Sequence, residues 1–477
     1  MQIVLGCIIG YLILTNIIGL AVGRRVKSTP DFLVASSNFG WVFLVAILCG
    51  AWEGSGASIG ITQQAYDKGI YPGFYTGFFT IGLVLAALFF VPILRKLKIL
   101  TLPEFIGEMY GEAGRKITAV LWLAQDLIVL AMQFLGAAGI FSGLFGIPMH
   151  WGMLITLISV GAYMVMGGMV AAAWTNMLHT LVMLLSAVIA VPLAMNFGSG
   201  FQTVVDTLPQ SYFHVQGMGM STLMGWFLAV AAGPIIHQIT FSTAASAKND
   251  KEAKNSFFIS ASIIALYSVP FAILGVVAKT YLPEGTSLTA LPMIAMEISP
   301  WFAGFLLSAV MAAILSTLAP MLFSAPTIFI NDIYKPMKKN TTEKELLMVS
   351  RISSLVTLLI GLGLAMLVKS IVAATVFAFT FRLVLLLGVV IPLMFASLKF
   401  ITVPGGLLGI ALGAIAPTLS QFVFQSSIPG MYWSVLGMVV GIIVGSLFTR
   451  GKGRYIKTIW DYIKDRQMME HKDNILG

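Results

Sequence analysis

Runs of about 20 apolar residues recur along the whole of this 477-residue chain. An α-helix of that length crosses the ~30 Å hydrocarbon core of a bilayer, where no water is available to satisfy exposed backbone groups. The pattern predicts an all-α polytopic membrane protein with about 13 transmembrane helices. The expected spans are 2–22, 40–64, 70–94, 117–144, 149–169, 171–196, 219–246, 256–278, 302–330, 352–368, 372–397, 402–425 and 429–449.

The composition agrees with a membrane protein. Hydrophobic residues make up 58% of the chain and charged residues 10%, which excludes a soluble domain. The net charge of +9 reflects where lysines and arginines lie relative to the bilayer and does not indicate a nucleic-acid partner. Most basic residues fall on one side if the N-terminus lies outside. We therefore expect a multi-pass protein of the plasma (inner) membrane, with the N-terminus outside and the C-terminus in the cytoplasm.

Two of the expected spans contain residues that interrupt a helix. The second contains "LCGAWEGSGASIGI" (48–61), with three glycines around Glu53, and the seventh contains Gly233-Pro234 in its middle. Glycine costs up to ~1 kcal/mol in a helix, and proline removes a backbone hydrogen bond. Because the breaks are five helices apart, they predict an inverted repeat of helices 2–6 and 7–11, with helices 2 and 7 broken near mid-membrane.

This arrangement divides the chain into five segments. The loops between spans are short and hold no soluble domain, so we do not expect an enzyme with an appended catalytic domain. The segments are an extra N-terminal helix with a cytoplasmic loop (1–39), the first repeat (40–196), the second repeat (219–397), two additional C-terminal helices (402–449) and a basic cytoplasmic tail (450–477). The tail is expected to form an amphipathic helix along the inner leaflet.

Three formally charged side chains fall inside the expected spans: Glu53, Asp126 and Arg382. Charges within a membrane are tolerated when they are paired or hydrated, and they often mark functional sites. Together these three leave one negative charge, which a single bound monovalent cation would neutralise. The alternative is a structural ion pair between Arg382 and one of the two acids.

Several segments resemble, in the same order, those of one known family. They are "GRRVKSTPDFLVASSNFG", "QQAYDKGIYPGFY", "TLPEFIGEMYG", "MVMGGMVAAAWTNMLH" and "ILSTLAPMLFSAPTIFINDIYKP". On these motifs the chain resembles the sodium/solute symporter family, which has the leucine-transporter-like (LeuT-like) fold. The resemblance implies Na⁺-coupled import of a small organic solute by alternating access.

The resemblance also implies a sodium site between helices 2 and 9. Its ligands would be carbonyl groups on both helices and two hydroxyl groups on helix 9, from Ala51, Gly54, Ala313, Ser316 and Thr317. Glu53 occupies the place of an acid that some family members carry beside this site. We therefore expect Glu53 to support the ion site by long-range attraction for Na⁺.

The chain departs from the family pattern at two places. A second sodium site found in some members would use positions that read Ala319, Pro320 and Asn176 here. These offer neither an anionic ligand nor a pair of hydroxyl groups, so we expect one Na⁺ per cycle. The tyrosine that proline-carrying relatives place four residues before the helix 7 proline is Val230 here, which argues against a simple proline transporter.

The solute is inferred from Arg382, because its helix borders the substrate chamber in the family. A guanidinium group binds a carboxylate through two parallel hydrogen bonds. This predicts a carboxylate-bearing solute, an amino acid or a monocarboxylate, held by Arg382. Asp126 or Gln133 would meet the amine or hydroxyl end, and Trp226 would cover the solute.

Other functions remain open at this point. A proton-coupled carrier of the same fold would use Glu53 or Asp126 as its proton site. A transporter-like solute sensor, a channel, and an intramembrane enzyme with a metal cluster of His179, His237 and Asp126 are further alternatives. The expected partners are a small-molecule solute and the lipid bilayer, with no nucleic acid and no transition metal. The sequence does not give the oligomeric state.

Overall fold

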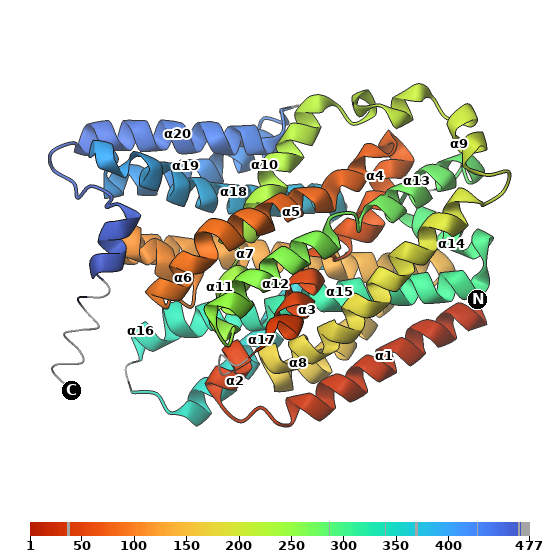
Figure 1. Cartoon of the computed structure of the whole chain (residues 1–477), viewed down its shortest axis with the longest axis horizontal. Coiled ribbons are helices and arrows are strands. Elements are labelled where there is room, and N and C mark those ends of the chain that lie inside the picture. Colours follow the sequence, from red (N-terminus) through yellow and green to blue (C-terminus); the bar gives the residue numbers. More distant parts are fainter. Residues whose placement is uncertain are drawn as a thin grey trace.

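The structure, a computed structural model, is built almost entirely of helices (Figure 1). It describes residues 1–35, 39–285, 287–338, 340–367, 371–426, 428–465 and 468. Residues 36–38, 368–370 and 469–477, which belong to the expected segments 1–39, 219–397 and 450–477, lie outside the described residues. The helices in chain order are α1 (Gln2–Gly23), α2 (Thr29–Val34), α3 (Trp41–Trp52), α4 (Ile61–Lys68), α5 (Tyr75–Leu85), α6 (Val91–Leu97), α7 (Leu102–Phe145), α8 (Met149–Met195), α9 (Phe201–Thr207), α10 (Met220–Ile236), α11 (Gln238–Ser246), α12 (Asp250–Ile264), α13 (Val269–Tyr281), α14 (Ala290–Ile298), α15 (Pro300–Ile328), α16 (Lys335–Met337), α17 (Glu343–Ala365), α18 (Ile371–Phe395), α19 (Val403–Phe422) and α20 (Gly430–Thr449).

The all-α, polytopic character of the chain is confirmed. By length and composition, eleven helices of the described residues can each cross a bilayer, and one bent pair makes twelve. The expected spans 149–169 and 171–196 lie together in the 47-residue α8. A straight helix of that length would measure ~70 Å, but Gly168 interrupts it with φ 47° and ψ −134°. A Cβ atom there would lie 2.4 Å from the carbonyl oxygen of Phe32, so only glycine fits.

The break expected in helix 2 lies between α3 and the π-helical turn η2 (Gly56–Gly60) that leads into α4. The two halves, Trp41–Trp52 and Gly56–Lys68, are bent by 51°. Gly54 lies in the break and packs tightly: a Cβ atom on it would be 2.6 Å from both Thr317 Oγ1 and Gln133 Nε2. The glycine therefore lets the unwound backbone approach two other helices closely.

The break in helix 7 lies at His237, between α10 and α11, three residues beyond Pro234. His237 is extended, with φ −77° and ψ 141°. Its ring Nδ1 accepts a hydrogen bond from Ile239 N at 3.1 Å, which caps α11. The carbonyl of Pro234 accepts from the hydroxyl of Thr240 at 2.5 Å instead of a backbone N–H. Proline thus weakens the helix at position 234, and the helix ends about one turn later, where side-chain hydrogen bonds replace the missing backbone bonds.

The helix α15 runs through the interior of the bundle (Figure 1). It packs against α1, α3, α7, α8 and α17, and 94% of its most apolar window is buried. A helix that is apolar on all sides is stable in such an interior position. Outside this core, α1 and the paired helices α19 and α20 lie on opposite sides of the bundle (Figure 1).

The described part of the C-terminal tail folds back onto the bundle. Its helix covers residues 459–465, and Ile456, Tyr462 and Ile463 are buried in a cluster with the ends of α6 and α7. The Thr458 N–H donates to Asp461 Oδ2 at 3.1 Å and the Asp461 N–H to Thr458 Oγ1 at 3.3 Å, which caps the helix. The Thr458 hydroxyl also donates to Asp461 Oδ2, at 2.7 Å, and this bond together with that from the Thr458 N–H holds the pKa of the Asp461 carboxyl below its usual range.

Candidate ion and solute site

A cavity of about 30 Å³ lies where the break in helix 2 meets α7, α15 and α18. That space holds one or two water molecules, so a solute enters only after the surrounding helices move apart. The lining combines freed backbone, aromatic rings, one amide, two hydroxyls and one cation. The lining residues are Ala51, Trp52, Gly54, Gly56, Ala57, Tyr75, Phe79, Val129, Met132, Gln133, Thr317, Met321, Phe379 and Arg382.

The residues expected to bind sodium lie together beside this cavity. Thr317 Oγ1 donates to the carbonyl of Gly50 at 2.8 Å, and Ser316 Oγ donates to the same carbonyl at 3.2 Å and to that of Ala313 at 2.9 Å. Ala51, Gly54 and Thr317 line the cavity. Carbonyl oxygens of unwound helices coordinate Na⁺ in transporters with discontinuous helices, and hydroxyl oxygens are ligands of the same hard type. The donor chemistry therefore fits the ion.

Gly50 contacts the candidate sodium site, and the sequence did not reveal this contact. In a continuous helix its carbonyl would accept from the N–H of Gly54. Because α3 ends at Trp52, this carbonyl is freed and turns to the two hydroxyls of α15. The sequence signal that could have indicated this role is that Gly50 lies four residues before Gly54, a glycine in the predicted break. Asn176 packs against the same place, with Nδ2 donating to the carbonyl of Ser316 at 3.4 Å.

Glu53 is fully buried, but it does not line the cavity. Neither of its carboxylate oxygens has a hydrogen-bond partner in the described part of the chain. Any effect of Glu53 on an ion at the Ser316–Thr317 hydroxyls is thus exerted by its field and not by direct coordination.

Arg382 reaches the cavity from α18. Its Nε donates to Gln125 Oε1 at 2.5 Å, and Gln125 Nε2 donates to Asp126 Oδ1 at 3.0 Å. The other oxygen of Asp126 accepts from Ser324 Oγ at 3.0 Å. The guanidinium carbon lies 4.2 Å from the ring centre of Phe379. Arg382 and Asp126 are therefore connected through an amide, and no direct ion pair joins them within the described residues.

The two other residues expected at the solute site lie in different places. Gln133 lines the cavity, and its Oε1 accepts from the backbone N–H of Ser55 in the helix 2 break at 2.9 Å. Trp226 lies outside the lining and packs edge-on against Tyr75, with ring centres 5.7 Å apart. Tyr75 itself does line the cavity. It ends the motif "QQAYDKGIYPGFY", which was the one signal for it in the sequence.

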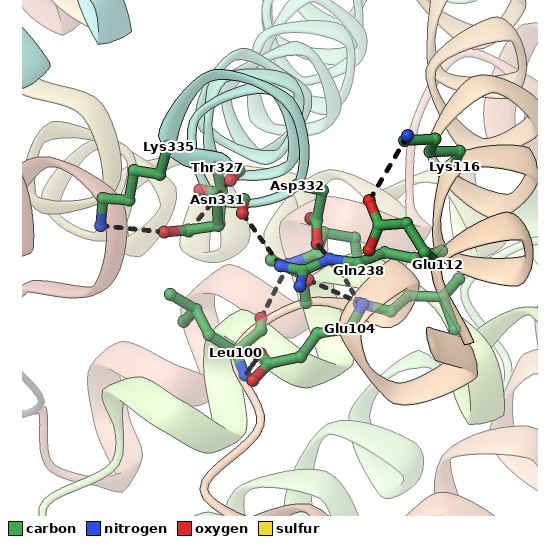
Figure 2. A network of polar contacts seen from close by, with 12 residues as sticks. Leu100, Glu104, Glu112, Lys116, Gln238, Thr327, Asn331, Asp332 and Lys335 are labelled. Atoms are coloured by element: carbon green, nitrogen blue, oxygen red, sulfur yellow. Dashed lines mark hydrogen bonds and ion pairs between the residues drawn. The ribbon is translucent and has the colours of Figure 1, made fainter. Parts of the chain in front are cut away.

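A second polar cluster lies where α7, α11 and the end of α15 approach one another, on the side expected to face the cytoplasm (Figure 2). We call it the polar clamp; it consists of Leu100, Arg115, Gln238, Asn331 and Asp332. Arg115 Nε on α7 pairs with Asp332 Oδ1 at 2.7 Å in the π-helical turn η8 (Phe329–Tyr334) that continues α15. Gln238 at the start of α11 donates to the Leu100 carbonyl at 3.0 Å. The clamp thus joins α7 to η8 through Arg115, and α11 to the loop before α7 through Gln238.

A family profile decides the identity of the chain. The profile described as the sodium:solute symporter family matches residues 32–413. The chain belongs to the sodium:solute symporter family. A sodium/glucose cotransporter of Vibrio parahaemolyticus is 25% identical over 386 residues, covering 72% of this chain and 71% of the relative. The sodium/proline symporter of Escherichia coli (strain K12) is 25% identical over 470 residues, covering 90% of each.

The solved structures agree on the fold. A Na⁺-coupled sialic acid symporter in a substrate-bound outward-open state superposes with a TM-score of 0.81, at 18% identity, covering 96% of this symporter and 98% of that chain. The nucleobase-cation-symport-1 family transporter Mhp1 gives a TM-score of 0.57 at 14% identity, with 91% and 98% covered. The expected LeuT-like fold is thereby confirmed.

These findings confirm the general activity. The chain is a multi-pass membrane symporter that couples the movement of Na⁺ to the import of a small-molecule solute, and it is not an enzyme. Na⁺ is the coupling ion. Na⁺-coupled symport is therefore the function, in place of the four alternatives that the residues alone had left open: a proton-coupled carrier, a sensor, a channel and an intramembrane enzyme.

Proposed function

We propose that this symporter imports a small carboxylate-bearing solute, an amino acid or a monocarboxylate, together with one Na⁺. The observation that carries the proposal is the position of Arg382. Its guanidinium group borders the cavity, and its two terminal nitrogens have no hydrogen-bond partner among the described residues. A buried cation with two free parallel donors is suited to the two oxygens of a carboxylate.

We propose that Na⁺ binds at the oxygens of Ala51, Gly54, Ala313, Ser316 and Thr317, with Glu53 adding attraction through its field. Gln133 would meet the polar end of the solute, Asp126 would act on it through Gln125, and Trp226 would support the cavity from behind Tyr75. The positions Ala319, Pro320 and Asn176 supply no second anionic ion site, which supports a stoichiometry of one Na⁺.

The proposed cycle follows from these contacts. Na⁺ between α3 and α15 would hold the two helices together and favour the outward-open state with a completed solute chamber. The broken helices would then rock against the remaining scaffold in the inverted-repeat core, with the N-terminus outside and the C-terminus in the cytoplasm. Low cytoplasmic Na⁺ would release both ligands. Moving one charge through 100 mV is worth about 2.3 kcal/mol, so import of a zwitterion would carry current, whereas a monocarboxylate would balance the Na⁺ charge.

The first test is thermal unfolding of the detergent-purified protein in Na⁺ against K⁺, with acetate, propionate, butyrate and amino acids as solutes. A ligand at 100 times its dissociation constant adds about 2.7 kcal/mol to the stability of the folded state. We expect a Na⁺-specific rise in melting temperature that one carboxylate enlarges. Arg382→Gln should abolish the solute effect and uptake while keeping the Na⁺ effect. Uptake that survives in Arg382→Gln would overturn the proposal.

A further inference from the structure

We infer that Gln125 is a positioning residue that makes the site selective for an anionic group, because it holds Arg382 in place while keeping Asp126 from pairing with it. This inference rests on the proposed role of Arg382 in binding the solute. On this inference, the uncharged Gln125 keeps the guanidinium group of Arg382 available to the solute. Gln125 and Asp126 are fully buried, and Arg382 is 2% exposed, so solvent does not take over this task.

The chemistry of the three groups allows only one arrangement of the amide. A guanidinium group donates hydrogen bonds and cannot accept them, whereas an ionised carboxylate accepts and cannot donate. Gln125 lies between one of each and must present its oxygen to Arg382 Nε, at 2.5 Å, and its nitrogen to Asp126 Oδ1, at 3.0 Å. The orientation of the Gln125 side chain is thus determined by its partners. A carboxylate or an apolar residue at this position cannot satisfy both neighbours.

The connection uses only one edge of the guanidinium group. The bond to Gln125 involves Nε, which leaves the two terminal nitrogens without a hydrogen-bond partner among the described residues, on a side chain that lines the cavity. Asp126 is meanwhile occupied at both oxygens, by Gln125 and by Ser324. If Asp126 met Arg382 directly, it would take the parallel donors that a carboxylate solute needs. The amide therefore lets the acid compensate the buried charge from a distance without competing for it.

The guanidinium group is also fixed by stacking. It lies over the rings of Phe379 and Trp52, at 4.2 Å and 5.6 Å from their centres. A binding group that is held in place before the solute arrives loses less conformational entropy on binding. Among the described residues, Gln125 supplies the one hydrogen bond that sets the rotation of the guanidinium plane on these rings. Its removal should therefore affect solute affinity more than Na⁺ affinity.

The main test is Gln125→Glu, which keeps the size of the side chain and adds a charge. The probes are acetate, propionate, butyrate, L-alanine and L-proline, each beside its primary amide in a Na⁺-driven uptake assay. We expect the KM for the transported carboxylate to rise at least tenfold, the preference over its amide to fall by a similar factor, and the Na⁺-dependent melting shift to remain. Gln202→Glu is the matched control, because Gln202 also donates to an aspartate, Asp206, at 2.9 Å but lies on the surface.

A second variant covers the case in which Gln125→Glu does not fold. Gln125→Met removes both hydrogen bonds and should let Asp126 pair directly with Arg382, which again raises the KM for the carboxylate. Adding Asp126→Asn should then recover part of the lost affinity, an effect that a purely structural role would not produce.

Two kinds of result distinguish a failure of the role of Gln125 from a failure of the proposed function. An unchanged preference for carboxylate over amide in folded Gln125→Glu or Gln125→Met protein would overturn the role of Gln125. Normal uptake by Arg382→Gln, or no transport of any probe carboxylate, would instead overturn the proposed function on which that role depends.

Discussion

The hydroxyl group of Thr317 in α15 donates a 2.8 Å hydrogen bond to the carbonyl of Gly50, in the last turn of α3. This bond joins the broken helix 2 to the most buried helix of the bundle, at a distance of 267 residues in the sequence. It lies beside the oxygens proposed to bind Na⁺. Gain or loss of the ion is therefore expected to change how firmly the moving helix is held to the scaffold, which is what coupling requires.

Removal of one hydroxyl ligand should weaken Na⁺ binding selectively. In Ser316→Ala we expect the Na⁺ concentration for half-maximal melting shift to rise about tenfold, which corresponds to ~1.4 kcal/mol. Ser308→Ala is the matched control, because the Ser308 hydroxyl is also buried on α15 but bonds to Gly304 of its own helix at 2.7 Å. An equal Na⁺ response in both variants would show that Ser316 is not a ligand.

The glycine in the helix 2 break should not tolerate a methyl group. A Cβ atom at Gly54 would lie 2.6 Å from Thr317 Oγ1, and overpacking of this kind costs about 1–3 kcal/mol. We expect Gly54→Ala to lower the melting temperature and to remove the Na⁺ effect. The comparison is Gly6→Ala in α1, where no described atom outside the neighbouring backbone of its own helix lies within 4 Å of the added carbon. Wild-type Na⁺ stabilisation of Gly54→Ala would contradict the close packing of the break.

Charge alone at position 382 should be insufficient. Lysine is a compact cation without the planar fork of arginine, and Arg382→Lys also loses the Nε bond to Gln125. We expect this variant to fold and to respond to Na⁺, but to take up the carboxylate at least tenfold less efficiently. Measurement of KM separately from the maximal rate checks this. Uptake at the wild-type KM would mean that the site needs only a positive charge.

The polar clamp should depend on Arg115 and not on its neighbour (Figure 2). Arg115→Gln leaves the buried Asp332 without its ion-pair partner. We expect a loss of about 2 to 3 kcal/mol, less than the ~3–5 kcal/mol of a fully buried pair, because the Arg115 side chain is 26% exposed. Lys116→Gln, whose pair with Glu112 is exposed at 69% and 57%, should leave the melting temperature unchanged.

The double variant Arg115→Gln/Asp332→Asn provides the check on that mechanism. It removes the unpaired charge, so its melting temperature should recover toward the wild-type value. If it is no more stable than Arg115→Gln, the contact between the two side chains does not stabilise the bundle.

The sequence by itself determined the class of fold and, to within about one helical turn, the places where helices 2 and 7 break. It also supplied the proposed residues of the sodium site, through resemblance to a family. Each apolar run must be long enough to cross the bilayer by itself, so the runs identify the spans without any knowledge of the neighbouring helices. Glycine around Glu53 and the Gly233-Pro234 pair weaken a helix through backbone effects that are equally local. The motif series then placed Ser316 and Thr317 opposite helix 2 through resemblance to a family, and the structure brings these groups together.

Only the tertiary structure decided which groups meet across the bundle. Gln125 and Arg382 are 257 residues apart, and nothing in either segment shows that an amide separates the arginine from Asp126. The same holds for Glu53, which lies outside the cavity, and for the freed carbonyl of Gly50. Such contacts depend on the rotation and depth of each helix relative to its neighbours. Helix rotation is set by the packing of many side chains at once, and no single segment of the sequence contains that information.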